Sequence, residues 1–389
     1  MITAIISEFN PITNGHKHII KKASENGDTV ICIMSGNFVQ RGEGSILPKH
    51  VRAKMAVLAG ADMVCELPVH FSCCNAETFA FGAMKLISQI KGVDRVLFGS
   101  ECGNITRLQA QADFSEDKYF KKSLSKNLAK GTTFAKAKSD THLESGSEFS
   151  LSPNDVLGVE YIRAGKKVGF KGEFETIKRI GSDHDSENPQ GEFASASFIR
   201  SCLLAGDTEK ARQYMPTKAF ELLLESDIVD CSSLGVLASY QGIFGKERED
   251  ISEVSEGLEN LMFQNDFDGF SEYAMKIKSK RYTLARIKRM SVKNVLNITK
   301  SDVKFAKKHV KFLKVLAVKK ERTDLFSQDL GIKLIKRTKD IQTLGKKQKK
   351  ILSQMQKSDL VYSIFSKEVQ LQMEVAEGRD VGGMDVGGC

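Results

Sequence analysis

Strand-like and helix-like segments alternate through the first 100 residues, and this alternation constrains the fold more than any other feature. Short apolar runs, typical of buried strands, occupy residues 2–9, 28–34, 61–68 and 93–100. Amphipathic segments with a helical period lie between them, at residues 15–26, 49–60 and 76–90. Apolar strands separated by amphipathic helices are what a parallel sheet covered on both faces requires. The pattern therefore predicts an α/β domain with a doubly wound parallel sheet, which binds ligands at the carboxyl ends of its strands.

The pattern changes after residue 100 and again near residue 208. We expect a polar, helical insert near 105–150, a strand within 169–180, and a loop and helix over 194–206 that end at Gly206. This places an α/β domain at residues 1–207. A mainly helical, basic region is expected over 208–375, with strand-like segments at 312–318 and 332–337. The glycine-rich residues 376–389 are expected to form a disordered tail.

The sequence carries no signal for membrane insertion or secretion. It has no run of about 18 apolar residues, and it enters a strand-like segment without the basic stretch and cleavage site of a signal peptide. We therefore expect a cytoplasmic protein with no membrane partner. The eight cysteines are scattered, and no two have C-x-x-C spacing. Because zinc sites need closely spaced thiolates and imidazoles, we expect mostly buried cysteines and no metal site.

Basic residues are concentrated between residues 271 and 350. This stretch holds 25 Lys and Arg against 6 Asp and Glu, a net charge of +19. The whole chain carries +9, so the residues outside this stretch carry −10. A solvated helix surface accounts for part of this excess, but so large a local charge repels itself unless an anion neutralises it. We therefore expect this stretch to bind a polyanion.

The stretch EFNPITNGHKH, residues 8–18, connects the first expected strand to the first expected helix. The beginning of such a helix offers unpaired N–H groups and a positive dipole to a phosphate, and Gly15 lets a ligand approach the backbone closely. The spacing of a Walker lysine loop is absent, and the Gly-Glu-Gly at 42–44 lacks the third glycine of a dinucleotide fingerprint. What remains is a phosphate site with an imidazole, for which His16 is the candidate.

A second candidate stretch is SASFIR, residues 195–200. Ser197 and Arg200 lie one helical turn apart, so a hydroxyl and a guanidinium can meet the same anion at a helix entrance. The alternative is a capping serine beside an ordinary surface arginine.

The two stretches resemble the two signatures of the nucleotidyltransferase α/β phosphodiesterase superfamily, in the same order along the chain. FNPITNGH is similar to the [HT]-x-G-H signature, and SASFIR is similar to the second signature, which ends in arginine. More narrowly, EFNPITNGH, SGNFVQRGE, GADMVCELP, LFGSE, SPNDVLGVEY and KRYTLARIKR together resemble the bacterial tRNA(Met) cytidine acetate ligase family. The resemblance runs from residue 1 to about residue 300.

The resemblance implies a two-step reaction. ATP and acetate give acetyl-adenylate and pyrophosphate, and the acetyl group then passes to the exocyclic amine of the wobble cytidine in elongator tRNA(Met). It implies that acetyl-CoA takes no part, and we expect Mg²⁺ to be carried on the ATP phosphates. Attack on the α-phosphorus builds negative charge that fixed donors must stabilise, the role expected of His16. Members of the family commonly have histidine where this chain has Thr13, so this stabilisation depends more heavily on His16 and backbone donors.

The resemblance also implies the residues that contact the substrates. Catalysis is assigned to His16 and Thr13, and Ser197 and Arg200 are assigned to the β and γ phosphates. The full set of expected ATP contacts is Ser7, Glu8, Phe9, Asn10, Pro11, Asn14, Gly15, Gly99, Asn154, Arg179, Ser197 and Arg200. Arg41 and Lys49 flank a polar loop after the second strand, where a cation can pair with acetate or released pyrophosphate. The triplet Asp183, His184 and Asp185 resembles a metal site, but we expect it to order the rim of the active site.

The segment KSKRYTLARIKRMSVKN, which begins at Lys278, is the part of the basic stretch that we expect to bind tRNA. Its cations Lys278, Lys280, Arg281, Arg286, Lys288 and Arg289 lie within twelve residues that contain no acidic side chain. Tyr282 lies among them and can stack on an unpaired anticodon base. Two other functions fit part of the sequence. A small-molecule adenylyltransferase of the same superfamily leaves the basic stretch unexplained, and a noncatalytic RNA-binding protein conflicts with the intact His16, Ser197 and Arg200.

Overall fold

One sheet organises the molecule. A computed structural model describes residues 1–25, 27–131, 136–137, 140–141, 144, 152–179, 189, 191–245, 248–254, 257–264, 266–279, 282–366 and 376–378. Its strands are β1 (Ile2–Ser7), β2 (Thr29–Ser35), β3 (Met63–Leu67), β4 (Val93–Ser100), β5 (Glu173–Lys178), β6 (Phe312–Lys319), β7 (Lys333–Ile335) and β8 (Ala376–Gly378). The strands lie in the order β5-β4-β1-β2-β3-β6-β7, and β8 pairs with β6. The first five strands are mutually parallel, so the expected doubly wound α/β fold is confirmed.

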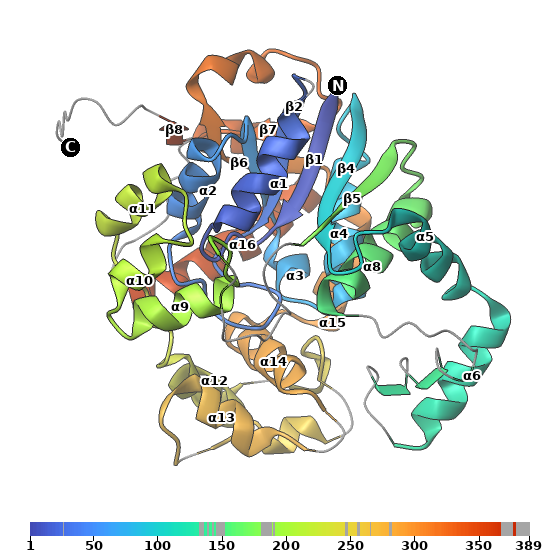
Figure 1. Cartoon of the computed structure of the whole chain (residues 1–389). Helices are drawn as coiled ribbons and strands as arrows, with labels where there is room; N and C mark the ends of the chain where they lie inside the picture. Colours follow the sequence, from blue (N-terminus) through green and yellow to red (C-terminus); the bar gives the residue numbers. More distant parts are fainter. Residues whose placement is uncertain are drawn as a thin grey trace.

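Helices cover the sheet and extend beyond one end of it (Figure 1). The α-helices are α1 (Asn14–Ser24), α2 (Lys49–Leu58), α3 (Val69–Ser72), α4 (Ala76–Ile87), α5 (Ile105–Phe114), α6 (Lys118–Ala129), α8 (Pro153–Val168), α9 (Ala196–Leu204), α10 (Thr208–Arg212), α11 (Thr217–Leu224), α12 (Leu234–Phe244), α13 (Gly269–Ile277), α14 (Leu284–Leu296), α15 (Lys300–His309) and α16 (Lys346–Ser366). Short 3-10 segments are η1 (Arg248–Asp250), η2 (Leu258–Leu261), η3 (Lys320–Phe326) and η4 (Thr338–Thr343).

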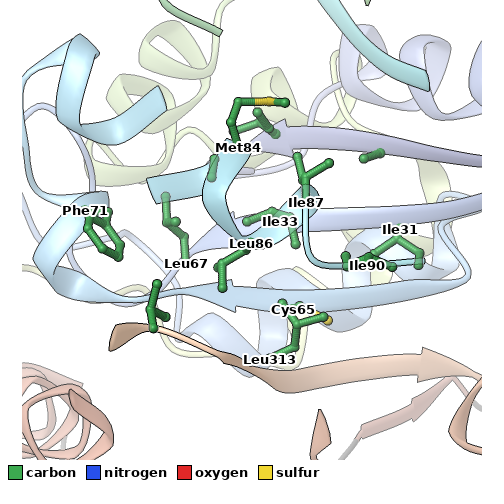
Figure 2. Close-up of a cluster of buried hydrophobic side chains, with 14 of the residues drawn as sticks. Ile31, Ile33, Cys65, Leu67, Phe71, Met84, Leu86, Ile87, Ile90 and Leu313 are labelled. Carbon is green, nitrogen blue, oxygen red and sulfur yellow. The ribbon is translucent and has the colours of Figure 1, made fainter. Parts of the chain in front are cut away.

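Alternate residues of the central strands face opposite sides of the sheet, as a two-sided sheet requires. Ile31 and Ile33 of β2 lie in the cluster that Figure 2 shows, together with Met84 and Ile87 of α4. Cys32, between them, belongs to the opposite cluster, which α1, α2, α9 and α11 help to build. A third cluster joins α12, α13 and α14, which lie together below the sheet in Figure 1.

The two strands expected at 312–318 and 332–337 are present, but they do not belong to a separate region. β6 runs antiparallel to β3, with Lys314 opposite Glu66, and β7 and β8 pair with β6. The last strand is formed by Ala376–Gly378, where the sequence indicated the start of a disordered tail; residues 379–389 lie outside the described residues. The pairing of β6 with β3 has a physical reason. Every residue of β3 is buried, so without a further strand β3 would leave an unpaired edge of the sheet in the interior. Because β6 and β7 belong to the same sheet as β1 to β5, a domain boundary at residue 207 remains a proposal only for the helices that follow it.

The described cysteines and helices can be compared with the expectations for burial, membrane insertion and metal binding. Cys32, Cys65, Cys73, Cys74 and Cys202 are buried and free, as expected. Within the described residues, no helix is both long enough and apolar enough to span a bilayer. The same residues contain no group of three His, Cys, Asp or Glu side chains that could hold a metal ion. The triplet at 183–185 lies outside the described residues.

Candidate active site

The loop after β1 turns directly into α1 and fixes the ring of His16. Thr13 caps the helix, because its Oγ1 accepts the His16 backbone N–H at 3.2 Å. In return, His16 Nδ1 accepts the Thr13 backbone N–H at 3.0 Å. Phe9, which has a φ of 43°, packs the edge of its ring against His16. A non-glycine residue in the left-handed region is strained, and such strain persists where the surroundings hold it, often at functional sites.

The hydrogen bonds define the form of imidazole that this site presents. Burial and then the charge of Arg179 lower the pKa of His16 to about 3, so the ring is neutral near pH 7. Because Nδ1 accepts a backbone N–H, the ring proton is on Nε2. His16 lines the cavity described below and therefore offers a neutral N–H donor there. The Thr13 backbone N–H thus fixes the tautomer of His16, a role that does not require a second imidazole.

The second signature meets the first one across the chain. α9 begins after Ser195, whose side chain caps the helix by accepting the Phe198 N–H. Arg200 donates from Nη1 to the carbonyl of Asn10 at 2.7 Å and from Nη2 to Ser197 Oγ at 3.1 Å. The guanidinium therefore joins the loop after β1 to the entrance of α9. Ser197 and Arg200 lie side by side, as their spacing of one helical turn predicts, and their joint contact with an anion stays a prediction.

The ends of β4 and β5 supply the third side of the site. Gly99 is close to Arg179, since a Cβ at Gly99 would lie 3.3 Å from Arg179 Cγ. Nε of Arg179 is buried and has no hydrogen-bond partner among the described residues, and it lies 3.9 Å from Glu101 Oε1. Asn154, in the first turn of α8, donates to the same Glu101 oxygen at 2.5 Å. A buried guanidinium N–H that has no partner needs an acceptor, and a bound anion would supply one.

These three groups of residues surround one hollow at the carboxyl ends of the strands. It has two adjoining lobes that share much of their lining. The expected residues that line both lobes are Glu8, Asn10, His16, Arg41, Gly99, Asn154, Arg179 and Arg200. Thr13, Gly15 and Ser197 line the first lobe, and Ser7 and Phe9 line the second. Their spacing fits a nucleotide bound across the end of the sheet.

Two expected contacts from the same loop have other positions. Asn14 donates from Nδ2 to the carbonyls of Glu192 and Gln213, at 2.9 and 3.0 Å, and so joins α1 to later segments. Neither Asn14 nor Pro11 lines either lobe of the hollow. Both residues shape the loop that carries His16, and direct contact of their side chains with ATP stays a prediction without support here.

Lys49 does not reach the hollow, so its expected role toward acetate or pyrophosphate is wrong for this structure. Its side chain is fully buried, and Nζ lies 2.9 Å from Glu66 Oε2 and 2.5 Å from Asp359 Oδ1. Lys314 joins the same two carboxylates at 3.2 and 3.3 Å. Burial alone would raise the pKa of Glu66, but the two lysines lower it to about 2. Lys49 is thus part of a buried cluster of two lysines and two carboxylates that has no net charge. The cluster joins α2, β3, β6 and α16.

The basic segment that begins at Lys278 is largely an inner surface. Tyr282 is only 7% exposed and lies in the third hydrophobic cluster, under the guanidinium of Arg286 at 4.7 Å from the ring centroid. Lys288 is paired with Glu43 at 2.5 Å, and Arg289 is paired with Glu253 at 3.2 Å. The expectation that Tyr282 stacks on a base is therefore wrong.

The remaining cations of this segment have different positions. Lys278 is exposed, and Lys280 and Arg281 lie outside the described residues. The physical reason for the error is that α14 is amphipathic, with Ile287 and Met290 buried, so its charged residues beside the buried face form ion pairs with neighbouring segments. The density of charge in a sequence does not show which charges already have partners.

Sequence analysis missed several residues that line or support the hollow. Glu43, Lys178 and Phe193 line the first lobe, and Tyr161 lines the second. Glu101 organises the Asn154 side, since it also accepts from Ser152 Oγ at 2.9 Å. Glu101 follows the strand end in LFGSE, so its place at a carboxyl strand end was the signal that could have found it.

The chain is similar to a known family model and to curated proteins. The family model described as HIGH Nucleotidyl Transferase matches residues 1–377. A tRNA(Met) cytidine acetate ligase of Clostridium perfringens (strain SM101) is 32% identical over 397 residues, which cover 96% of this chain and 97% of that protein. One from Caldicellulosiruptor saccharolyticus is 38% identical over 304 residues, covering 74% of this chain and 75% of that protein.

Solved structures agree with the sequence relatives. Apo TmcAL of Thermotoga maritima is 27% identical, with a TM-score of 0.87, over 97% of this chain and 99% of that chain. The same protein bound with alpha-thio ATP is 26% identical, with a TM-score of 0.85 and the same coverage. The similarity therefore extends along nearly the whole length of both chains.

Proposed function

Because the chain belongs to the tRNA(Met) cytidine acetate ligase family, within the HIGH nucleotidyl transferases, we propose that it uses ATP to join acetate to the wobble cytidine of elongator tRNA(Met), giving 4-acetylcytidine. As a member of this family the chain is a ligase. The observation that carries the proposal is the meeting of both nucleotidyltransferase signatures in one hollow, through the bonds of Arg200 to Asn10 and Ser197. With these substrates, we infer that the reaction takes place in the cytoplasm.

The hollow supports a specific assignment of the ATP contacts. His16 donates from Nε2 to the α-phosphate, and Ser197 with Arg200 holds the β and γ phosphates. The unpartnered Nε of Arg179 supplies a further donor to the phosphates. Gly99 has no side chain, which leaves the space that Arg179 occupies beside the strand end. Hydrogen bonds fix His16 and Arg200 before ATP binds, which is the condition under which such donors stabilise a transition state most.

Acetate is the attacking group in the first step. Arg41 lines both lobes and is the cation placed to pair with acetate or with released pyrophosphate. The oxygen of acetate forms a bond to the α-phosphorus, and the bond to pyrophosphate breaks with its electron pair. Mg²⁺ enters on the phosphate oxygens of ATP, because Mg²⁺ is usually held by substrate phosphates with few protein ligands. Acetyl-CoA has no part in this scheme.

The first prediction separates this reaction from its alternatives. The purified protein should catalyse acetate-dependent exchange of labelled pyrophosphate into ATP in the absence of tRNA, and acetyl-CoA should not replace ATP and acetate. Exchange that depends on a small nucleotide instead of acetate would favour the adenylyltransferase. No exchange with any acid would favour the noncatalytic RNA-binding protein.

A different surface from the one expected at Tyr282 is suited to the body of the tRNA. We define the lysine ridge as the exposed Lys304, Lys308 and Lys311 at α15 together with the exposed Lys346, Lys347 and Lys349 at the start of α16. Partial desolvation and then the charges of Lys347, Lys308 and Lys311 lower the pKa of His309. Lysines from both helices therefore gather at one place, and none of the six has an ion pair with a described residue.

The lysine ridge also lies at the edge of the sheet where the hollow is found. It leads into β6, whose Lys314 is opposite Glu66 near the carboxyl end of β3. That edge is the one at which β1, β4 and β5 form the hollow. A polyanion on the ridge can therefore extend toward the reaction site along a single edge, and its phosphates neutralise charges that would otherwise repel one another.

The second prediction is a matched charge series. Replacing Lys304, Lys308 and Lys347 together by Gln should weaken tRNA binding and reduce the salt slope of log K by up to about 2, at roughly 0.7 for each lost single-strand phosphate contact. Acetate-dependent exchange should be unchanged. The control removes the same charge at Lys118, Lys122 and Lys126, which are exposed on α6. Equal weakening by both triple variants would mean that net charge, and not the ridge, determines binding.

A further inference from the structure

A carboxylate in a phosphate-binding hollow needs an explanation. Glu8 lines both lobes, together with the cations Arg41, Arg179 and Arg200. Glu43 is the other carboxylate that lines the first lobe, and it is already paired with Lys288 at 2.5 Å. An unpaired carboxylate repels phosphate and acetate, so Glu8 weakens the binding of every anionic substrate. The presence of Glu8 therefore indicates that it interacts with a group that is not an anion.

Glu8 is held in a fixed position. Its Oε1 accepts the backbone N–H of Gln40 at 2.6 Å, and Oε2 has no hydrogen-bond partner among the described residues. The Glu8 carbonyl accepts from Nη1 of the buried Arg52 at 2.5 Å. The same guanidinium also donates to the carbonyls of Leu47, at 3.0 Å, and Gly36. One side of the carboxyl group is thus anchored, and the other side is available to a ligand.

The surroundings also adjust its basicity. Burial raises the pKa of Glu8, and this effect exceeds the lowering by the Gln40 N–H and by the nearby arginines. A carboxylate with a raised pKa binds a proton more readily than an exposed one, which suits a general base near neutral pH.

We propose that Glu8 accepts the proton of the cytidine amine during acetyl transfer. This inference rests on the proposed function and adds the base that its second step requires. The lone pair of cytidine N4 forms a bond to the acetyl carbonyl carbon, and one N4 proton moves to Glu8 Oε2. The bond between that carbon and the AMP oxygen breaks, and AMP leaves with the electron pair. Glu8 then returns its proton to water.

The second step needs such a base more than the first does. The lone pair of the cytosine amine is delocalised into the ring, so the amine is a weak nucleophile that becomes acidic as the new bond forms. Acetate, in contrast, attacks the α-phosphorus without a proton to lose. A base at Glu8 therefore predicts different effects on the two steps, and this difference is the test.

The test compares both half-reactions in Glu8→Gln, which keeps an oxygen for the Gln40 N–H. Transfer from preformed, enzyme-bound acetyl-adenylate to tRNA, measured in a single turnover, should fall about 100-fold, within the range of general-base contributions. Acetate-dependent pyrophosphate exchange should fall much less than transfer, because acetate has no proton to lose. Transfer by the parent protein should rise with pH along a limb that Glu8→Gln lacks, and Glu8→Asp should restore part of the rate.

Three results would overturn the proposal. A raised KM for ATP in exchange, with transfer unchanged, would mean that Glu8 binds the adenine amine. Equal losses in both half-reactions would mean that Glu8 supports the site as a whole. Unchanged transfer would exclude the base outright. If the parent protein forms no adenylate from acetate, the proposed function fails first and this inference fails with it.

Discussion

Replacing His16 with alanine is expected to lower acetate-dependent pyrophosphate exchange by about 100- to 1000-fold, the loss found when one preorganised donor is removed from a transition state. The reason is that Nδ1 accepts the Thr13 N–H, so Nε2–H is the donor that we propose for the α-phosphate. ATP binding, measured by calorimetry, should change little, because the charge that this donor stabilises develops in the transition state. An exchange rate near that of the parent protein would remove His16 from the mechanism.

The pH dependence of exchange gives the same claim a second test. The pKa of His16 is lowered to about 3, so the ring stays neutral from pH 5 to pH 8. We therefore expect no limb near pH 6.5 that disappears in His16→Ala. Such a limb would mean that an imidazolium acts in place of the neutral N–H. The control is His309→Ala, which lies beside the lysine ridge and should not affect exchange.

The second large effect concerns stability. Asp359→Ala should reduce the free energy of unfolding by about 3–5 kcal/mol, because removing one partner of a buried ion pair leaves an uncompensated charge. In this variant the two buried lysines, Lys49 and Lys314, would share Glu66 as their remaining partner in the cluster. The measurement is the shift of the urea midpoint multiplied by the slope of the transition.

Two further variants give the stability prediction its controls. Asp329→Ala removes a carboxylate whose pair with Lys91 is exposed, at 77% and 65%, and should leave the free energy of unfolding nearly unchanged. The double variant Lys314→Met with Asp359→Leu should lose less stability than Asp359→Ala, since it removes one charge of each sign. If Asp359→Ala were no more destabilising than Asp329→Ala, the cluster would not be needed for stability.

Much of the fold follows from local patterns. The apolar strands and amphipathic helices of the first 100 residues predicted the parallel sheet and the edge at which it binds ligands, since period and length are properties of each segment. The addition of β6 to β3 could not be predicted in the same way. Pairing between residues as distant as Glu66 and Lys314 depends on which sheet edge is open, and no local pattern records that.

Some residues of the site could likewise be predicted from local patterns, and others could not. His16, Ser197 and Arg200 lie in short motifs, and the structure brings both motifs together as expected. Lys49 and Tyr282 were misjudged because their roles depend on burial and on distant partners. Asp359, which pairs with Lys49, is 310 residues away, so sequence alone gave no reason to expect that pair.

The measurement that tests the central claim most directly is transfer of labelled acetate into RNA. The protein is incubated with ATP, labelled acetate and elongator tRNA(Met), and the RNA is digested to nucleosides. The account predicts one label per tRNA, on the cytidine at the wobble position, and no label when ATP is omitted or replaced by acetyl-CoA. Label-free RNA in the presence of active exchange would contradict the proposed acceptor, and label supplied by acetyl-CoA without ATP would contradict the ligase mechanism.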